Sequence, residues 1–242
     1  MLAVAKVVIP SFSSGGGGAN SCVRDNHLFC ADWVSRNWSG VLQPALTQHI
    51  ALTLIAISIG SAISLVLSLA AHRRGWLERP VIIVTGILFT IPSLALFQIL
   101  VPSLGLTRAN AEVALVSYTL LILFRNTLTG LREIPEEVRE AARGMGMSQR
   151  QLLWRVELPL ALPAIMAGLR IATVTVISLA TVAAYVCNEG LGVPIFAGIQ
   201  ESVFKTEIIA AGALAIMLAL ASDALLVGIQ RLLTPWARKH AV

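Results

Sequence analysis

The sequence predicts an all-α, polytopic membrane protein with about five transmembrane helices. Its mean hydropathy is +0.79. With 56% hydrophobic and 13% charged residues, the 242-residue chain has too little charge to cover a soluble globule of its size. The apolar residues also gather in runs close to the roughly 20 residues that one bilayer crossing requires.

Five such runs are predicted to cross the membrane, near residues 48–71, 80–101, 109–129, 160–186 and 207–231. The chain is thereby divided into three parts: an amino-terminal tail (1–47), a transmembrane domain (48–233) and a carboxy-terminal tail (234–242). The amino-terminal tail contains a Gly/Ser-rich stretch over residues 11–20, which is typical of a flexible linker.

The basic residues predict how the chain is oriented. Lysine and arginine gather in the segments after the first, third and fifth runs, and the positive-inside rule assigns such segments to the cytoplasm. We therefore expect the 133–159 loop and the carboxy terminus inside the cell and the amino terminus outside. The formal net charge of +5 has the same explanation, so we expect no nucleic-acid partner.

The three cysteines do not have the spacing of a metal site, and no metal is expected. If the amino-terminal tail is extracytoplasmic, Cys22 and Cys30 can form a disulfide there. Two unrelated thiols fit the sequence equally well, so both alternatives stay open.

A highly charged loop, residues 133–159, separates the third run from the fourth. Pro135 suits the first turn of a short helix, and Gly146 suits the left-handed cap that would end it. The 3.6-residue periodicity predicts one apolar face on this helix, formed by Val138, Ala141, Ala142 and Met145. The polar residues Arg139, Glu140 and Arg143 are then available to a partner.

A second short helix is predicted directly after the first. Ser148 and Gln151 have the spacing of a capping box, which marks a helix start. We expect Leu158-Pro159 to end this helix before the next span begins. The loop is therefore predicted to be a rigid elbow of two helices.

Pro92 interrupts the second apolar run near its middle and frees backbone carbonyl groups. One interpretation is a kink with no further purpose. The other is a constriction or gate in a transport pathway, lined by Thr90, Ser93 and Gln98. The sequence favours neither interpretation.

Two ionisable residues lie well inside predicted spans, Arg170 in the fourth and Asp223 in the fifth. An unpaired charge at this depth is costly, so such residues pair with one another or line a pathway. We favour a structural ion pair between them over a role in the pathway.

The loop also resembles a known family. Glu140-Ala141-Ala142, Gly146 and Val156-x-Leu158-Pro159 resemble the E-A-A-x3-G-x9-I-x-L-P loop of permease subunits in binding-protein-dependent ABC importers. Valine in place of isoleucine is the only departure. The resemblance implies a type I importer permease fold whose loop docks on a cytoplasmic ATPase as a coupling helix. The implied coupling residues are Val138, Glu140, Ala141, Ala142, Arg143, Met145 and Gly146.

Further segments resemble permeases for osmoprotectants and quaternary amines such as glycine betaine, choline and carnitine. They are T-I-P-S-L-A-L-F (90–97), L-F-R-N-T-L-T-G-L-R (123–132) and L-P-L-A-L-P-A-I-M-A-G-L-R-I-A-T (158–173). A permease for methionine or another amino acid is the close alternative, and an ion-driven secondary transporter is a less favoured one. The sequence departs from the relatives' G-G-L-G turn at 188–192, where it reads N-E-G-L-G.

The sequence lacks the phosphate-binding G-x-x-x-x-G-K-[ST] motif, so we expect a transport subunit and not an enzyme. The resemblance implies that ATP and Mg²⁺ are used by a partner, a cytoplasmic ABC ATPase dimer. It also implies a second permease, identical or sibling, and an extracytoplasmic substrate-binding protein. The expected location is a bacterial cell membrane, with lipid around the helices.

Overall fold

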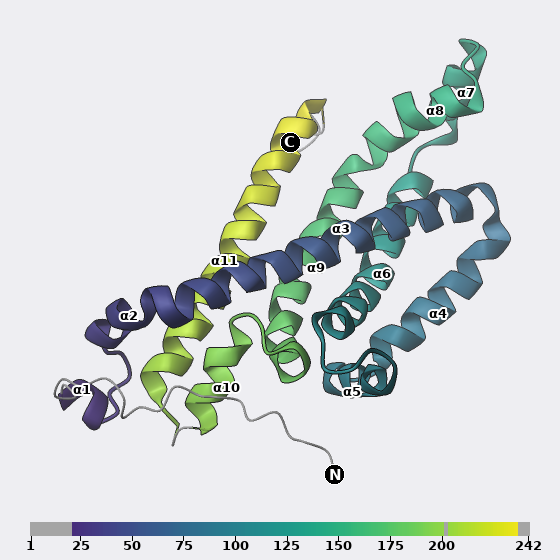
Figure 1. The fold of residues 1–242 in the computed structure, drawn as a ribbon. Helices are drawn as coiled ribbons and strands as arrows, with labels where there is room; N and C mark the ends of the chain where they lie inside the picture. The colour runs from purple at the N-terminus through teal and green to yellow at the C-terminus, as the bar shows by residue number, and fades with distance from the viewer. Residues whose placement is uncertain (1–20, 201–202, 237–242) are drawn as a thin grey trace.

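The computed structural model describes residues 21–200 and 203–236, and every regular element within these ranges is helical (Figure 1). The linker expected at 11–20 and most of the carboxy-terminal tail lie outside the described residues. The helices are α1 (Ser21–Arg24), α2 (Ala31–Asn37), α3 (Gln43–Arg73), α4 (Glu78–Thr90), α5 (Ser93–Leu104), α6 (Arg108–Arg132), α7 (Glu136–Gly144), α8 (Gln149–Leu152), α9 (Leu158–Cys187), α10 (Gly192–Gln200) and α11 (Lys205–Leu233). Two π-helical turns, Trp38–Leu42 and Leu153–Glu157, and one 3-10 turn, Gly75–Leu77, complete the set.

Four helical stretches of the described chain are long and apolar enough to cross a membrane. They are Ala31–Arg73, Arg108–Arg132, Gln149–Cys187 and Lys205–Leu233. The bent pair Gly75–Thr90 and Ser93–Leu104 provides a fifth if it counts as one span. The prediction of an all-α protein with about five spans is therefore confirmed.

The second predicted span, 80–101, is not one helix. Helix α4 ends at Thr90, α5 begins at Ser93, and the two meet at an angle of 100°. Ile91 takes an extended conformation because the ring of Pro92 disfavours the helical conformation at the preceding residue. The Tyr118 hydroxyl donates to the Ile91 carbonyl, so the freed backbone acceptor is satisfied.

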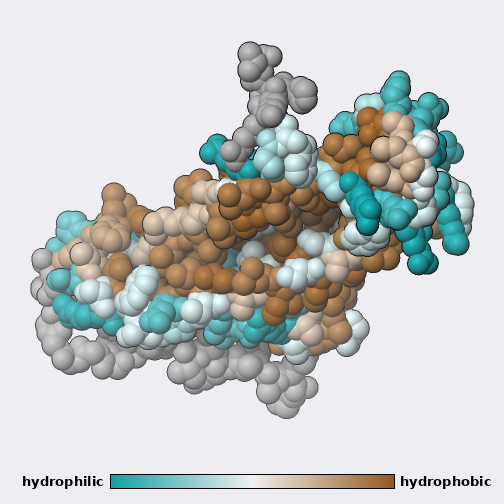
Figure 2. Space-filling model, turned by 90° about the horizontal axis from the view of Figure 1, so that it is seen from above, coloured by the Kyte–Doolittle hydropathy of each residue, from teal (hydrophilic) through white to brown (hydrophobic). Residues whose placement is uncertain are grey.

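The main core lies where α3, α5, α6 and α9 meet. Small residues set the distance between these helices: a Cβ added at Gly60 would lie 1.9 Å from the Thr119 Oγ1. One added at Gly168 would lie 2.6 Å from the Asn126 Cβ. Close backbone approach of this kind is how helices associate in a bilayer, where hydrophobicity cannot drive them together. Figure 2 shows the consequence, a surface on which hydrophobic side chains cover much of the bundle.

The amino-terminal segment, residues 21–37, forms a strap over the start of α11. A Cys22–Cys30 disulfide closes it, which decides between the two alternatives left open by the sequence. The Asn26 side chain donates to the Val203 carbonyl and accepts from the Lys205 amide, both at 3.0 Å. In addition, Trp33 packs edge-to-face on Phe204 with ring centroids 5.3 Å apart. The strap therefore fixes the beginning of α11.

The turn between α9 and α10 is fastened to α3. The His49 Nδ1 accepts from the Leu191 amide at 3.2 Å, so its Nε2 carries the proton and donates to the Ile177 carbonyl at 3.0 Å. The Gln48 side chain accepts from the Gly190 amide. Gly190 has φ +85°, and an added Cβ would lie 3.0 Å from the His49 ring. Sequence reasoning did not identify His49.

Candidate coupling site

The charged loop forms an elbow, residues 133–157, that projects from the helix bundle (Figure 1). Its first arm is α7. Pro135 precedes this helix as its N-cap residue, one position earlier than expected. The helix ends at Gly144, and Gly146, with φ +80°, provides the predicted left-handed cap. The Gly146 amide donates to the Arg143 carbonyl and the Met147 amide to the Ala142 carbonyl, the paired bonds of a Schellman cap.

The second arm begins as predicted but does not end as predicted. The Ser148 hydroxyl accepts from the Gln151 amide, and the Gln151 side chain accepts from the Ser148 amide, which completes the capping box. The expected end at Leu158-Pro159 is wrong, because the π turn joins α8 to α9 in one helix, Gln149–Cys187. Pro159 cannot donate a backbone hydrogen bond, and the wider π turn just before it absorbs this loss.

The predicted apolar face of α7 is buried at one edge and exposed over the rest. Ala142 is only 2% exposed and faces the rest of the chain. Val138, Ala141 and Met145 are exposed, and Met145 has 71% of its surface accessible. The four residues lie on one side of the helix, as their spacing predicts. Ala142 is the buried edge that anchors the helix, and the other three form an exposed face, the candidate coupling face.

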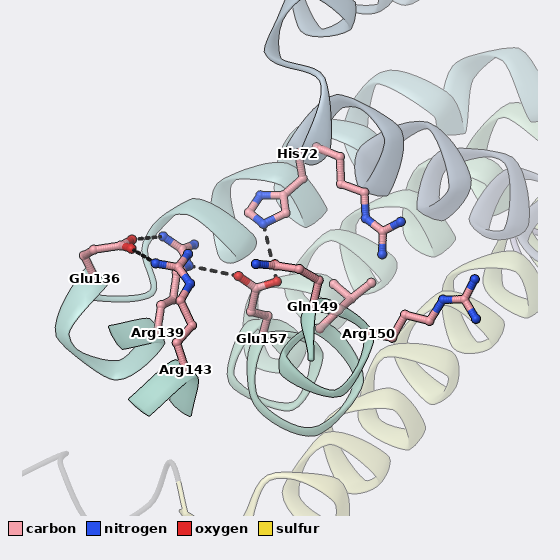
Figure 3. Close-up of a pocket in the computed structure, with 9 residues that line it drawn as sticks. His72, Glu136, Arg139, Arg143, Gln149, Arg150 and Glu157 are labelled. Carbon is pink, nitrogen blue, oxygen red and sulfur yellow. Dashed lines mark hydrogen bonds and ion pairs between the residues drawn. The ribbon is translucent and has the colours of Figure 1, made fainter. Parts of the chain in front are cut away.

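Arg139 anchors α7 from the same side as Ala142. Its guanidinium donates to the Glu157 carboxylate at 2.9 Å, to Glu136 at 3.1 Å and to the Leu131 carbonyl at 2.7 Å (Figure 3). Arg139 is thus not available to a partner, contrary to expectation. The Arg143 side chain donates to Glu136 at 2.8 Å. These hydrogen bonds from Arg139 and Arg143 lower the pKa of Glu136.

Glu157 is the buried centre of this network, and no sequence motif marks it. Its second carboxylate oxygen lies 3.4 Å from the His72 Nε2, at the end of α3. One carboxylate therefore joins three elements: α3, α7 and the π turn. A second link at the base of the elbow is bidentate, with both Arg132 guanidinium nitrogens 2.7 Å from the Glu78 oxygens.

Glu140 lies on the solvent side of α7. It is exposed, and no hydrogen bond or ion pair engages it within the described residues. Val138, Ala141 and Met145 form a small exposed apolar surface on α7, and Glu140 lies on the neighbouring, solvent-facing side of the helix. Such a surface can dock in a groove of a second protein.

The network borders an open hollow of about 610 Å³ beneath the elbow (Figure 3). Two glutamates and four arginines line it, together with one histidine, one glutamine and one leucine. The lining residues are His72, Arg73, Glu136, Arg139, Arg143, Gln149, Arg150, Leu153 and Glu157. No group of three His, Cys, Asp or Glu side chains placed to hold a metal ion occurs in residues 21–200 and 203–236.

The structure contains the ion pair expected inside the membrane. The Arg170 Nε lies 2.7 Å from one Asp223 oxygen, and the Arg170 Nη2 lies 3.0 Å from the other. The pair links α9 to α11. The side chains are 35% and 36% exposed, so a single copy of the chain covers them only in part.

The gate candidates lie at the corner between α4 and α5. The Thr90 hydroxyl donates to the Ile87 carbonyl within its own helix. Thr90, Pro92 and Gln98 are exposed, and Ser93 is half-buried. Thr90, Pro92 and Ser93 lie at this corner and Gln98 in the second turn of α5, and their role as a gate stays a prediction.

Arg108, the first residue of α6, lies between two carboxylates. Its guanidinium is 3.7 Å from Glu112 and 3.6 Å from Glu189. Sequence reasoning did not connect these three residues. Glu189 belongs to the turn in which the sequence departs from its relatives. The departure therefore adds an ion pair between this turn and α6.

Comparison with known structures supports the fold. A chain of the MetNI methionine ABC transporter, in an inward-facing crystal form, superimposes with a TM-score of 0.71. The match covers 83% of this chain and 98% of that chain. At 23% identity, the likeness concerns the fold alone.

Comparison with known sequences identifies the family. The family described as "Binding-protein-dependent transport system inner membrane component" matches residues 60–239. The choline transport system permease protein OpuBB of Bacillus subtilis (strain 168) is 36% identical over 189 residues, 78% of this chain and 86% of that protein. The osmoprotectant import permease protein OsmW of Salmonella typhimurium is 38% identical over 203 residues, 81% of this chain and 94% of that protein. The chain therefore belongs to the family of inner membrane components of binding-protein-dependent transport systems.

Proposed function

We propose that this chain forms the transmembrane pathway of an ATP-driven importer for osmoprotectants and quaternary amines such as glycine betaine, choline and carnitine. The observation that carries the proposal is sequence identity of 36–38% over most of the chain to permeases named for choline and osmoprotectant transport. The carnitine transport permease OpuCB of Listeria monocytogenes, 36% identical over 80% of this chain, supports the same substrate class.

In this proposal the elbow is the contact with a cytoplasmic ATPase dimer, which binds and hydrolyses ATP with Mg²⁺. Val138, Ala141 and Met145 enter a groove of the ATPase, and Glu140 pairs with a polar group at its rim. Ala142 and Arg139 hold α7 on the permease, and the Schellman cap at Gly146 fixes the angle between the two arms. Movement of the ATPase would then reach α9 through one unbroken helix.

The remaining partners and the orientation follow from the same reasoning. A second permease, identical or sibling, would complete the pathway, and an extracytoplasmic substrate-binding protein would deliver the substrate. Charge distribution supports a cytoplasmic elbow. The Cys22–Cys30 disulfide supports an extracytoplasmic strap, because disulfides persist in oxidising compartments.

Two alternatives have less support. The solved methionine transporter shares the fold with this chain at 23% identity, which is too distant to transfer its substrate. An ion-driven secondary transporter conflicts with membership of a family that works with binding proteins.

Uptake by the reconstituted system tests the substrate class. The chain would be co-expressed with the ATPase and binding protein encoded beside it and placed in proteoliposomes. We expect ATP-dependent uptake of radiolabelled glycine betaine, choline or carnitine and none of methionine. Uptake of methionine alone would contradict the proposal, as would uptake that continues without any ATPase.

The coupling contact has its own variant pair. Glu140→Lys reverses the free charge on the exposed face of α7 and should abolish uptake and release the ATPase in mild detergent. Glu133→Lys, an exposed change outside α7, is the matched control and should retain both. Equal ATPase retention by the two variants would contradict docking through α7.

Orientation can be measured with a membrane-impermeant thiol reagent in a Cys187→Ala background. Gly144→Cys suits the elbow, since an added Cβ there meets nothing within 4 Å. Leu106→Cys suits the opposite side, since Leu106 is exposed in the turn between α5 and α6. We expect intact cells to label Leu106→Cys only, and labelling of Gly144→Cys would reverse the orientation.

A further inference from the structure

Two of the arginine side chains that line the hollow beneath the elbow take no part in the ion pairs of the elbow. Arg139 and Arg143 are bound to Glu136 and Glu157, so those carboxylates are already neutralised. Arg73 and Arg150 also line the hollow. Within the described residues, no hydrogen bond or ion pair engages either of their guanidinium groups.

These two arginines belong to different elements. Arg73 is the last residue of α3, and Arg150 lies in the single turn of α8. In Figure 3, Arg150 lies on the side of the hollow opposite Glu136, away from the ion pairs. The hollow is thus divided into a neutralised side, formed by the Glu136–Arg139–Glu157 network, and a side with free positive charge.

The residues that line the hollow flank the ends of two apolar helices, where the membrane boundary is expected. The apolar helix α3 ends at Arg73, and the apolar helix α9 begins at Leu158, just after the lining residue Glu157. Two tryptophans near this level, Trp76 and Trp154, are largely exposed. Exposed tryptophan is typical of the headgroup region, where an apolar ring with one polar group is favoured.

We propose that this hollow binds the phosphate headgroup of an anionic phospholipid from the surrounding leaflet, with Arg73 and Arg150 as the phosphate ligands. Guanidinium groups bind phosphate oxygens through paired, charge-assisted hydrogen bonds. Basic pockets beside transmembrane helices on the cytoplasmic side are suited to such headgroups. The exposed tryptophans favour a lipid over a free phosphate, because exposed tryptophan is typical of the headgroup level of a membrane.

The position of the coupling face argues against a protein occupant. Val138, Ala141 and Met145 are exposed on α7, whereas Arg139 and Ala142 face the network and the chain. A partner on the coupling face would therefore meet the far side of α7 from the hollow. A bound headgroup would instead join the end of α3 to α8 and so add a third link beside His72–Glu157. The proposal rests on the orientation given under the proposed function.

Native mass spectrometry of the purified importer complex tests the proposal. The complex would be titrated with dioleoyl-phosphatidylglycerol and, separately, with dioleoyl-phosphatidylcholine. We expect the anionic lipid to bind about thirtyfold more tightly, the scale expected for two arginines near a headgroup. Arg73→Gln/Arg150→Gln should reduce this preference to about twofold or less.

Two control variants keep the result specific. Arg73→Lys/Arg150→Lys retains both charges and should keep most of the preference, which also shows that the double change is tolerated. Arg79→Gln removes an arginine of α4 that does not line the hollow and should leave the preference unchanged. An equal loss with Arg79→Gln would overturn the site, because general charge would then explain the binding.

Two further measurements distinguish the source of the phosphate and the class of occupant. Inorganic phosphate and glycerol phosphate at millimolar concentration should not displace the lipid, and complete displacement would overturn a lipid ligand in favour of a soluble anion. Separation of the ATPase should not expose additional lipid binding at Arg73 and Arg150. If it does, the hollow is a protein contact. Lipid retention is measured without transport, so the lipid site can fail while osmoprotectant uptake stands.

Discussion

The elbow and the strap fasten opposite ends of the same bundle by different chemistry. At the elbow, Arg139, Glu157 and Glu136 hold α7 through ion pairs. At the strap, a disulfide and the neutral amide of Asn26 hold the start of α11. Ion pairs respond to salt, pH and nearby charge, whereas neutral hydrogen bonds and a covalent link respond little. The difference indicates an elbow that can respond to a partner and a strap that stays fixed.

Breaking the buried ion pair of the elbow should have the largest effect. Arg139 and Glu157 are 14% and 7% exposed, so Arg139→Met leaves a buried carboxylate without its main partner. We expect a loss of about 3 kcal/mol in the stability of the elbow and a loss of uptake. Thermal unfolding and hydrogen exchange of the α7 amides in nanodiscs would measure the change.

The matched variants separate charge burial from general damage. Arg139→Met/Glu157→Leu removes both charges and should recover most of the lost stability, since no unpaired charge remains. Arg143→Met breaks only the exposed pair with Glu136 and should cost less than about 1 kcal/mol. If Arg143→Met is as damaging as Arg139→Met, burial is not the reason for the effect.

Removing the disulfide should have the next largest effect, confined to the strap. Cys22→Ser/Cys30→Ser opens a loop with a sequence separation of eight residues. For a loop of this size the loss of constraint is worth roughly 2–3 kcal/mol. Protease cleavage and hydrogen exchange near Lys205 and Thr206 should increase, while the α7 amides stay unchanged. Cys187→Ser is the control, and faster exchange in α7 would refute the independence of the two ends.

Two glycine-to-alanine substitutions should have smaller effects on stability, and the two effects should differ in direction. Gly190→Ala places a side chain at φ +85° and 3.0 Å from His49, and should cost roughly 1–2 kcal/mol. Gly144→Ala adds a methyl in open space within α7, where alanine is the better helix former. Melting temperatures should therefore fall for the first variant and not for the second. A melting temperature for Gly190→Ala at or above wild type would contradict the fitted contact with His49.

The smallest expected effect is a pH dependence limited to the elbow. Hydrogen bonds from Arg139 and Arg143 lower the pKa of Glu136 below its ordinary value of 4.5. The ionised Glu136 carboxylate therefore stabilises the elbow fully above pH 4.5, and this stabilisation is lost as pH falls through the lowered pKa. Exchange of the α7 amides, corrected for the intrinsic rate, should increase as pH falls below about 4.5. Glu136→Gln should reduce this change, and an unaltered profile would assign it to another group.

The sequence predicted the parts of this fold that depend on local pattern. The spans follow from apolar runs, and Gly146 and the Ser148–Gln151 box were identified because caps depend on residues a few positions apart. The same local reasoning placed a helix end at Leu158-Pro159. It was wrong there because a π turn, which has no sequence signature of its own, carries the helix past the proline.

The features that sequence reasoning missed are the ones that join distant segments. Glu157 meets Arg139 and His72 across 18 and 85 positions, and no periodicity connects them. His49 accepts a hydrogen bond from the Leu191 amide, 142 positions away in the sequence. The pair of Arg170 and Asp223 could be predicted from sequence because few charges lie deep in the spans, so few ion pairs are possible there.

The unbroken helix from Gln149 to Cys187 has a mechanical consequence. Its 39 residues span about 58 Å, so it works as a lever whose two arms end at the elbow and at the His49 turn. A tilt of about one degree around its midpoint would move each end by roughly 0.5 Å in opposite directions. The π turn at Leu153–Glu157 interrupts the α-helical hydrogen bonding near one end of this lever, and Arg139 and His72 hold the turn through Glu157.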